Sequence, residues 1–408
     1  MPFDRLAKAL DAHVSTLHQQ GTAKGKETVV TGVRRPTGDR GPRVLLEGEG
    51  GKEFIRMNSN SYLGLGLHSE VIEAEEAGSA AFGAGPGAVR FISGSYSVHV
   101  ELERELAAFH GREAAMVFSS AYATIVSVLT ALTTAETVLV SDELNHNCII
   151  NAMRMSRPGG KVVYPHLDIP ALDRALTEWS GKAKRALIVT DGIFSMRGDH
   201  APVAEIMEVA RRHDHAYEEN VVVLVDDSHG IGAFGETGRG AEEYTHSTPV
   251  DVLVGTLGKA FGVNGGYVTS SRAVVDFLRE SSPMYIYSNP ITAGEAAAAR
   301  GAVQIVDSEE GRTLLETLRA LTHRFEEGLG RIGIETIPGE HPVVPLMIRD
   351  TRRTRLLTDY LYQNGVLVTG LTYPVVPKGD EEIRAQVNAD HTEADIDRVL
   401  ALLEGYDG

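Results

Sequence analysis

Short apolar runs alternate with helical patterns through the middle of the chain. Between several of these runs, apolar residues recur at helical spacing, as in Ile206–His213. Seven runs are typical of buried strands: Ala115–Phe118, Val138–Val140, Val162–Tyr164, Leu187–Thr190, Val221–Asp226, Val252–Val254 and Tyr267–Thr269. Because continuous apolar runs indicate strands that are buried on both faces, the pattern predicts a mostly parallel sheet covered by helices on both sides.

The two ends of the chain differ from this middle part. Residues 1 to about 20 carry apolar residues near helical spacing, and a turn-prone segment continues to about Gly51. Near the other end, a helix is predicted from about Thr292 to Gly330, with short strands at Val344–Ile348 and Val366–Val368. A closing helix is expected from Thr392 to Leu403, with Thr392 as its N-cap.

These patterns divide the 408 residues into three expected parts. Residues 1–55 are predicted to form an N-terminal helix and an extended segment. Residues 56–290 are predicted to form a large α/β domain, and residues 291–408 a smaller C-terminal α+β domain. A chain of this length is ordinary for an enzyme with about two domains.

Composition narrows the function classes. The net charge of −17 argues against a general nucleic-acid surface, and no apolar run is long enough to span a bilayer. The N-terminus lacks the apolar stretch of a signal peptide, which predicts a cytoplasmic protein. The single cysteine, Cys148, excludes an intrachain disulfide, and its apolar neighbours favour packing over nucleophilic chemistry. No Cys/His cluster has zinc-ligand spacing, so no metal site is predicted.

Two predicted strands end in residues that suit pyridoxal phosphate (PLP). Asp226 ends one strand, with His229 three residues later, and Lys259 follows the next strand between glycines. An acid can hold the ring nitrogen of PLP protonated, and a lysine can carry the cofactor as a Schiff base. The same strand-end acid is also typical of metal-binding or purely structural sites, so these two segments alone leave the choice open.

Other strand ends carry further candidates, each with a simpler alternative. Ala121 and Tyr122 open a helix after a strand, which suits phosphate, although an ordinary helix cap explains the same pattern. Thr256, three positions before Lys259, strengthens the phosphate interpretation. His146 suits stacking on a cofactor ring, and Ser195 suits a bond to the phenolate oxygen; a capping histidine and a turn serine are the alternatives.

Ordered motifs over nearly the whole chain resemble the α-oxoamine synthases, a branch of the fold-type I PLP enzymes. They comprise Asn58–Leu65, Val89–Gly94, His99–Glu103, Ser141–His146, Val225–Gly230, Gly235–Gly240, Gly255–Lys259, Tyr373–Gly379, Ile383–Arg384 and Ala389–Thr392. Within this family the chain is most similar to the glycine C-acetyltransferases. The resemblance implies an aspartate aminotransferase-like fold and a homodimer with shared active sites.

The resemblance also implies a role for each matching residue. Lys259 would carry PLP, Asp226 and His229 would bond its ring nitrogen and phenolate oxygen, and His146 would stack on the ring; these four are the expected catalytic residues. The expected phosphate-binding residues are Ala121, Tyr122, Thr256 and, reaching across the dimer, Ser288 or Asn289. The expected groups for the amino-acid carboxylate are Asn60, Ser195 and Arg384, the last by a bidentate pair.

The implied activity is condensation of an amino acid with an acyl thioester, with glycine and acetyl-CoA as the first hypothesis. Met196-Arg197-Gly198-Asp199 and Gly94–His99 depart from the family spelling, as do Pro290 and the segment 83–88. These changes put glycine and acetyl-CoA in doubt. A decarboxylating biosynthetic synthase that uses another amino acid, a longer acyl-CoA or an acyl-carrier protein is the alternative. A noncatalytic partner subunit is a third hypothesis, which the presence of Lys259 and Asp226 disfavours.

Overall fold

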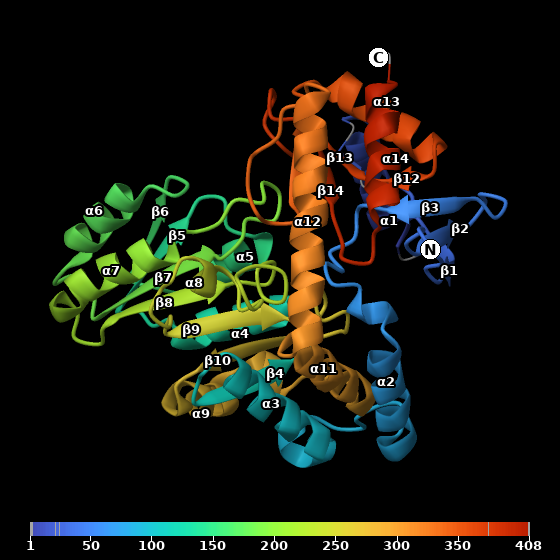
Figure 1. Ribbon diagram of the computed structural model, residues 1–408. Coiled ribbons are helices and arrows are strands. Elements are labelled where there is room, and N and C mark those ends of the chain that lie inside the picture. The colour runs from blue at the N-terminus through green and yellow to red at the C-terminus, as the bar shows by residue number, and fades with distance from the viewer. Residues whose placement is uncertain (1–2, 21, 24, 374, 407–408) are drawn as a thin grey trace.

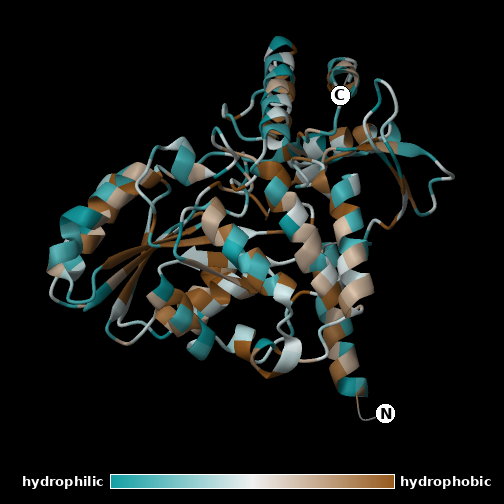
Figure 2. Cartoon of the chain, turned by 60° about the horizontal axis from the view of Figure 1, so that its bottom comes forward, coloured by the Kyte–Doolittle hydropathy of each residue, from teal (hydrophilic) through white to brown (hydrophobic). Residues whose placement is uncertain are grey.

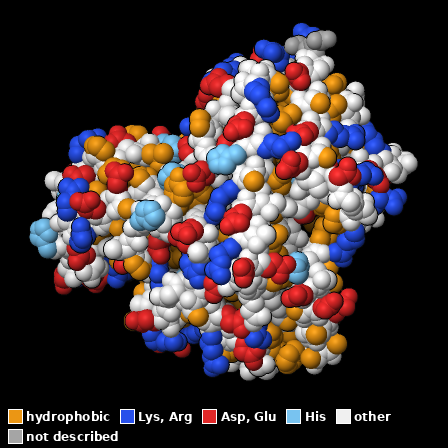
Figure 3. Space-filling model, viewed as in Figure 1, with side chains coloured by type: hydrophobic (Ala, Val, Ile, Leu, Met, Phe, Trp, Pro, Cys, Tyr) orange, Lys and Arg blue, Asp and Glu red, His pale blue; other side chains and the backbone are white. Residues whose placement is uncertain are grey.

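The computed structural model describes residues 3–20, 22–23, 25–373 and 375–406. Met1 and Pro2 of the predicted N-terminal helix, and Pro374 of the Tyr373–Gly379 motif, lie outside the described residues. In the described part of the chain, no helix is both long and apolar enough to cross a membrane. On the face drawn in Figure 3, basic and acidic side chains are interspersed.

A seven-stranded sheet forms the centre of the large domain, in the order β4-β10-β9-β8-β7-β5-β6 (Figure 1). Strands β5 to β9 run parallel, and β10 is antiparallel to both of its neighbours. All seven predicted strands are confirmed: β4 Ala114–Phe118, β5 Thr137–Asp142, β6 Gly160–Tyr164, β7 Arg185–Asp191, β8 Val221–Asp226, β9 Val252–Thr256 and β10 Gly266–Ser270. The sheet is therefore mostly parallel, as the apolar pattern predicts.

Helices cover both faces of this sheet. Alternate residues of β7 enter two separate cores, Ile188 on one face and Leu187 and Val189 on the other, because successive side chains of a strand point in opposite directions. In Figure 2 the central strands are accordingly hydrophobic along most of their length. The surrounding helices are α2 Ser69–Phe82, α3 Ser97–Phe109, α4 Ala121–Leu132, α5 Asn147–Met155, α6 Ile169–Trp179, α7 Val203–His213, α8 Ala241–Tyr244, α9 Arg272–Ser281 and α10 Pro283–Ile286, with short turns η1 Leu65–Leu67, η2 Arg90–Gly94 and η3 Asp214–Ala216.

The prediction of a single helix over residues 292–330 is wrong, because two helices occupy this segment. Helix α11 (Ala293–Val306) packs against α2 and α3, and α12 (Glu309–Arg331) continues toward the C-terminal part of the molecule (Figure 1). The break lies at Asp307 and Ser308, where the Ser308 hydroxyl accepts a hydrogen bond from the Gly311 N–H and so begins a new helix.

Two smaller sheets lie beside the large one, and one of them joins strands from both ends of the chain. One has the order β11-β14-β13, with bounds Val343–Met347, Glu382–Gln386 and Thr369–Leu371. The other has the order β1-β2-β3-β12, with bounds Val30–Arg34, Arg43–Leu46, Glu53–Arg56 and Val366–Leu367. The remaining helices are α1 Asp4–Gln19, α13 Thr351–Gln363 and α14 Glu393–Glu404.

This arrangement confirms some of the terminal predictions and corrects others. The first and last helices are present, and the Thr392 hydroxyl caps α14. The predicted strand at 366–368 is instead two short strands in different sheets, and the segment read as turn-prone contains β1 and β2. Strand β3 pairs in parallel with β12, a partner more than 300 residues away, which local composition does not reveal. The domain limits at residues 55 and 290 stay a prediction.

Candidate functional site

The carboxyl ends of β7, β8 and β9 bring together acids and a lysine. Asp191 and Asp226 lie side by side in register at the ends of β7 and β8. Both are buried, and Lys259 follows the end of β9. The Ser228 hydroxyl donates to Asp226 Oδ1 at 2.6 Å, which holds that carboxylate in place. In open α/β sheets, this edge is where ligands bind.

Burial lowers the pKa of Lys259 to about 8, although Asp226 and Asp191 pull it upward. Within the described ranges, its Nζ atom forms no hydrogen bond or ion pair with the protein. A buried amine without a partner, part of it neutral near physiological pH, is suited to act as a nucleophile or as a base.

Asp191 is a site residue that the sequence reasoning missed. Its Oδ2 atom accepts a hydrogen bond from the backbone N–H of His146 at 2.9 Å. Burial and the neighbouring carboxylate of Asp226 raise the pKa of Asp191 well above its usual value. Its position at the end of a strand, like that of Asp226, was the available signal.

His146 begins α5 and lies beside Cys148. Its Nδ1 atom accepts from the backbone N–H of Cys148 at 3.3 Å and lies 3.0 Å from Cys148 Sγ. The thiol in turn lies 3.5 Å from Asp226 Oδ2. Burial lowers the pKa of His146 and raises that of Cys148, so the imidazole is neutral and the thiol protonated. Cys148 is therefore a packing and hydrogen-bonding residue, and a thiolate nucleophile is disfavoured.

His229 is held from two sides by Tyr62 and His341, neither of which was given a role from the sequence. Its Nδ1 atom lies 2.7 Å from the Tyr62 hydroxyl. Its backbone carbonyl accepts from His341 Nε2 at 2.9 Å. Burial and the facing charges of Lys259 and Arg384 lower the pKa of His229 well below its usual value, so the ring is neutral.

The three residues expected to bind the amino-acid carboxylate are brought together from distant parts of the chain. Arg384, on β14, donates from Nε to the backbone oxygen of Ser195 at 2.5 Å and from Nη2 to Asn60 Oδ1 at 3.2 Å. Ser195 thus contacts Arg384 through its backbone, whereas the expectation was placed on its hydroxyl. These two hydrogen bonds orient the largely buried guanidinium of Arg384, which suits it to bind an anion.

The expected phosphate-binding residues are only partly assembled within one chain. The N–H groups of Ala121 and Tyr122 open α4, and in the described part of the chain neither has a protein acceptor. The Thr256 hydroxyl donates to the Gly265 carbonyl at 3.2 Å and accepts from the Gly258 N–H at 3.1 Å.

Ser288 and Asn289 follow α10, away from these groups. Among the described residues neither one forms a hydrogen bond to another predicted site residue; the Ser288 hydroxyl instead bonds the Asn289 carbonyl at 3.4 Å. Their expected reach into a partner subunit therefore stays a prediction.

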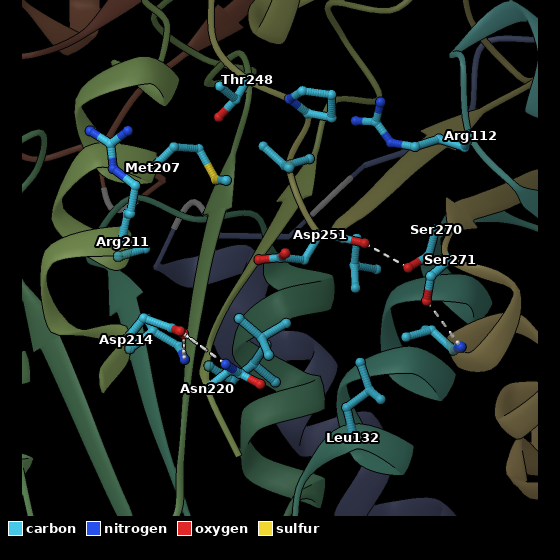
Figure 4. A pocket seen from close by; sticks show the side chains of 18 of the residues that line it. Arg112, Leu132, Met207, Arg211, Asp214, Asn220, Thr248, Asp251, Ser270 and Ser271 are labelled. Atoms are coloured by element: carbon cyan, nitrogen blue, oxygen red, sulfur yellow. Dashed lines mark hydrogen bonds between the residues drawn. The ribbon is translucent and has the colours of Figure 1, made fainter. Parts of the chain in front are cut away.

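A cavity of about 1270 Å³ lies at the opposite edge of the sheet (Figure 4). It is lined by residues at the amino ends of β7, β8 and β9, including Arg185, Val221 and Val252. Several of its polar groups bond one another, as Asn220 does with Asp214 and Ser270 with the Asp251 carbonyl. None of the predicted site residues lines this cavity.

The residues at the carboxyl edge fit PLP. The cofactor needs an acid at its ring nitrogen, a lysine for a Schiff base and N–H donors for its phosphate. Three features meet these needs: the Lys259 amine and the first N–H groups of α4, which have no partner among the residues described, and the oriented carboxylate of Asp226.

Comparisons with known proteins agree with this chemistry. The family "Aminotransferase class I and II" matches residues 52–403. The 8-amino-7-oxononanoate synthase of Geobacter sulfurreducens is 36% identical over 399 residues, which cover 98% of this chain and 97% of the relative. The enzyme of the same name from Geobacter metallireducens is 38% identical over 372 residues, which cover 91% and 92%.

Solved structures show the same similarity. A structure of SPT with PLP has a TM-score of 0.87 and 26% identity, over 99% of this chain and 96% of that chain. A serine palmitoyltransferase from Sphingomonas wittichii has a TM-score of 0.86 and 25% identity, over 99% and 96%.

Proposed function

Because the chain belongs to the class I and II aminotransferases, and within them to the α-oxoamine synthases, we propose that it condenses an amino acid with an acyl thioester and releases carbon dioxide. The fold is that of fold-type I PLP transferases, and the protein is a PLP-dependent acyltransferase. The observation that supports the decarboxylating reaction is the near full-length similarity to 8-amino-7-oxononanoate synthases.

The name of these relatives suggests the substrates. In 8-amino-7-oxononanoate, the amino carbon C8 carries the methyl group C9, which is the skeleton left when alanine loses its carboxylate. Carbons 1 to 7 correspond to a seven-carbon acyl group that ends in a second carboxylate. We therefore propose alanine and a seven-carbon dicarboxylic acyl thioester for this chain. These relatives do not support the first hypothesis, glycine with acetyl-CoA. They support better the alternative, a decarboxylating synthase that uses another amino acid and a longer acyl donor.

Each site residue then has a task. Bound PLP supplies an electron-withdrawing ring that stabilises negative charge at the α-carbon of the amino acid. Asp226 would pair with the ring nitrogen, His229 would donate to the phenolate oxygen and His146 would lie against the ring. Arg384, with Asn60 beside it, binds the substrate carboxylate as a charge-assisted pair. The Lys259 amine, with its pKa lowered to about 8, takes the α-proton.

Product analysis tests the proposal. The holoenzyme is incubated with carboxyl-¹³C-labelled alanine, glycine or serine and with acetyl-CoA, long-chain acyl-CoA or a seven-carbon dicarboxylic acyl thioester on CoA or on carrier protein. We expect labelled carbon dioxide and an aminoketone only when alanine meets the dicarboxylic donor. A product from glycine and acetyl-CoA that keeps its label would contradict the proposal and restore the acetyltransferase hypothesis. Absence of any product together with absence of PLP absorbance would favour a noncatalytic subunit.

We further propose a cytoplasmic homodimer in which Ser288 or Asn289 completes the phosphate site of the neighbouring subunit. The similarity to the α-oxoamine synthases supports this assembly. The exposed position of Asn289 leaves it accessible to a second chain. Light scattering of the holoenzyme is expected to give twice the mass of 44.0 kDa, and a monomer would contradict the assembly.

A further inference from the structure

Tyr62 lies between His229, which is expected to contact the cofactor, and Asn60 and Arg384, which are expected to bind the substrate carboxylate. Its side chain is fully buried, and its hydroxyl is 2.7 Å from His229 Nδ1 and 3.3 Å from Asn60 Oδ1. Arg384 donates to the same Asn60 oxygen at 3.2 Å. One hydroxyl therefore joins the residue expected at the cofactor's phenolate oxygen to the group that binds the substrate carboxylate.

The Tyr62 hydroxyl has one hydrogen and two acceptors within reach. Asn60 Oδ1 already accepts from the charged Arg384 guanidinium, and it is the more distant of the two. His229 Nδ1 is at the usual distance for a strong hydrogen bond and has no other partner in the described part of the chain. The hydrogen therefore points to His229.

Both partners keep the protonation states that this bond requires. Burial raises the pKa of Tyr62 far above its usual value, so the hydroxyl keeps its hydrogen. Burial lowers the pKa of His229, and the charged or titratable groups that face it act in the same direction: Lys259, Arg384, His341 and His146. A neutral imidazole carries one N–H, so accepting at Nδ1 leaves the hydrogen on Nε2.

We infer that Tyr62 is a positioning residue that fixes His229 in the tautomer with its hydrogen on Nε2. Only that tautomer lets the nitrogen opposite Tyr62 donate to a phenolate oxygen. The backbone of His229 is held as well, because His341 Nδ1 accepts from the Val343 N–H and its Nε2–H is therefore available to the His229 carbonyl. The inference rests on the proposed placement of the cofactor ring, and it does not depend on which amino acid or acyl group is used.

The first test needs no variant. Nitrogen NMR of the full-length holoenzyme, labelled with ¹⁵N-histidine, reports which ring nitrogen of His229 carries hydrogen, and His229→Gln identifies the signal. We expect Nδ1 without hydrogen and Nε2 with it. A hydrogen on Nδ1 would overturn the inference, because Tyr62 would then be the acceptor.

The second test removes only the hydroxyl, by Tyr62→Phe. Without a fixed tautomer, His229 would no longer donate to the phenolate oxygen at all times. The cofactor should then keep its proton to higher pH, because the negative charge on that oxygen is less stabilised. We expect the pH midpoint of the cofactor's absorbance change to rise by about half to one unit, the effect of one hydrogen bond. We also expect a mixture of His229 tautomers. A single, unchanged His229 tautomer in Tyr62→Phe would overturn the inference.

Tyr217→Phe is the matched control. Tyr217 is also buried, and its hydroxyl donates to the Leu176 carbonyl at 2.7 Å. It precedes the amino end of β8, whereas Asp226 lies at the carboxyl end of that strand. We expect both variants to lower the melting temperature, because each loses a buried hydrogen bond. Tyr217→Phe should leave the absorbance midpoint and the His229 signals unchanged. Equal midpoint shifts in both variants would show a general loss of stability and overturn the positioning role. None of these readouts uses a substrate, so they remain valid if the proposed reaction is wrong.

Discussion

Two histidines near the carboxyl edge of the large sheet have opposite charge states. Burial lowers the pKa of His166, but hydrogen bonds to Asp142 at 3.0 Å and Asp199 at 3.2 Å outweigh it and raise the pKa to about 9. His229 is buried as well, yet it faces Lys259 and Arg384 and has no carboxylate partner among the described residues, so its pKa falls. One ring is therefore a cation and the other is neutral.

The difference in charge matches a difference in role: His166 links two segments of the fold, and His229 is proposed to contact the cofactor. His166 joins Asp142 at the end of β5 to Asp199 in the turn that carries Ser195, so its charge holds two segments together. In the proposed site His229 would donate a hydrogen bond without carrying charge, and burial with the facing cations keeps it neutral. Opposite charges favour ionisation and like charges oppose it, so the neighbours decide the role of each ring.

The largest expected effect comes from removing the cation that faces His229. Lys259→Ala should reduce turnover by more than about 10⁴-fold, because general base catalysis alone contributes about 10²–10⁴-fold and the covalent anchor is lost too. The absorbance of covalently bound PLP should also disappear. Rapid-mixing kinetics measure the turnover, and absorbance spectra measure the covalently bound PLP. Lys184→Ala, which removes an exposed lysine paired with Glu136, is the control. A Lys259→Ala protein with normal turnover and absorbance would refute the assignment.

Arg384→Ala removes the second cation and should chiefly weaken binding of the amino acid. A hydrogen bond to a charged group contributes about 1.5–3 kcal/mol, so we expect the apparent Kd to rise about 10- to 150-fold. Titration of the holoenzyme spectrum with the amino acid measures this Kd. Arg349→Ala serves as the comparison, because Arg349 lies in an exposed pair with Glu335. An unchanged apparent affinity in Arg384→Ala would reject the carboxylate-binding role.

His166→Gln tests the structural half of the comparison and should have the smallest effect on turnover. Because the folded pKa of about 9 exceeds the ordinary value of 6.5, protonated His166 stabilises the fold fully below about pH 6.5 and loses this effect as pH rises through 9. The contribution at low pH is on the order of 2–3 kcal/mol.

Denaturant unfolding across pH 6 to 10, each series at matched ionic strength, measures this dependence. The wild-type free energy of unfolding should fall more steeply with pH than that of His166→Gln, and the two should converge at the alkaline end. Parallel curves would show that His166 is not the charged link.

Several residues of the site were predictable from sequence because each follows an apolar strand. Val221–Asp226 and Val252–Thr256 are buried parallel strands, so Asp226 and Lys259 necessarily reach the same edge. Arg384 and Asn60 were predicted from the family resemblance, and the structure places them within hydrogen-bonding distance.

Tyr62 and His341 were missed for a different reason. Tyr62 lies within the Asn58–Leu65 motif, but only Asn60 of that motif was given a role, and His341 lies in a segment with no periodic pattern. Their contacts with His229 span 167 and 112 residues of sequence, so no local signal reports them. The break between α11 and α12 was missed because alanine and leucine favour helix on both sides of Ser308, and only its cap interrupts the pattern.

The sequence by itself determined the seven strands of the large sheet, the family and the residue types available to the cofactor, because apolar periodicity and ordered motifs are properties of the chain. The tertiary structure alone decided which side chains meet, and through these contacts the lowered pKa values of His229 and Lys259 and the charge of His166. These quantities depend on burial and on charges a few ångströms away. Such neighbours come from segments far apart in sequence, and only folding brings them together.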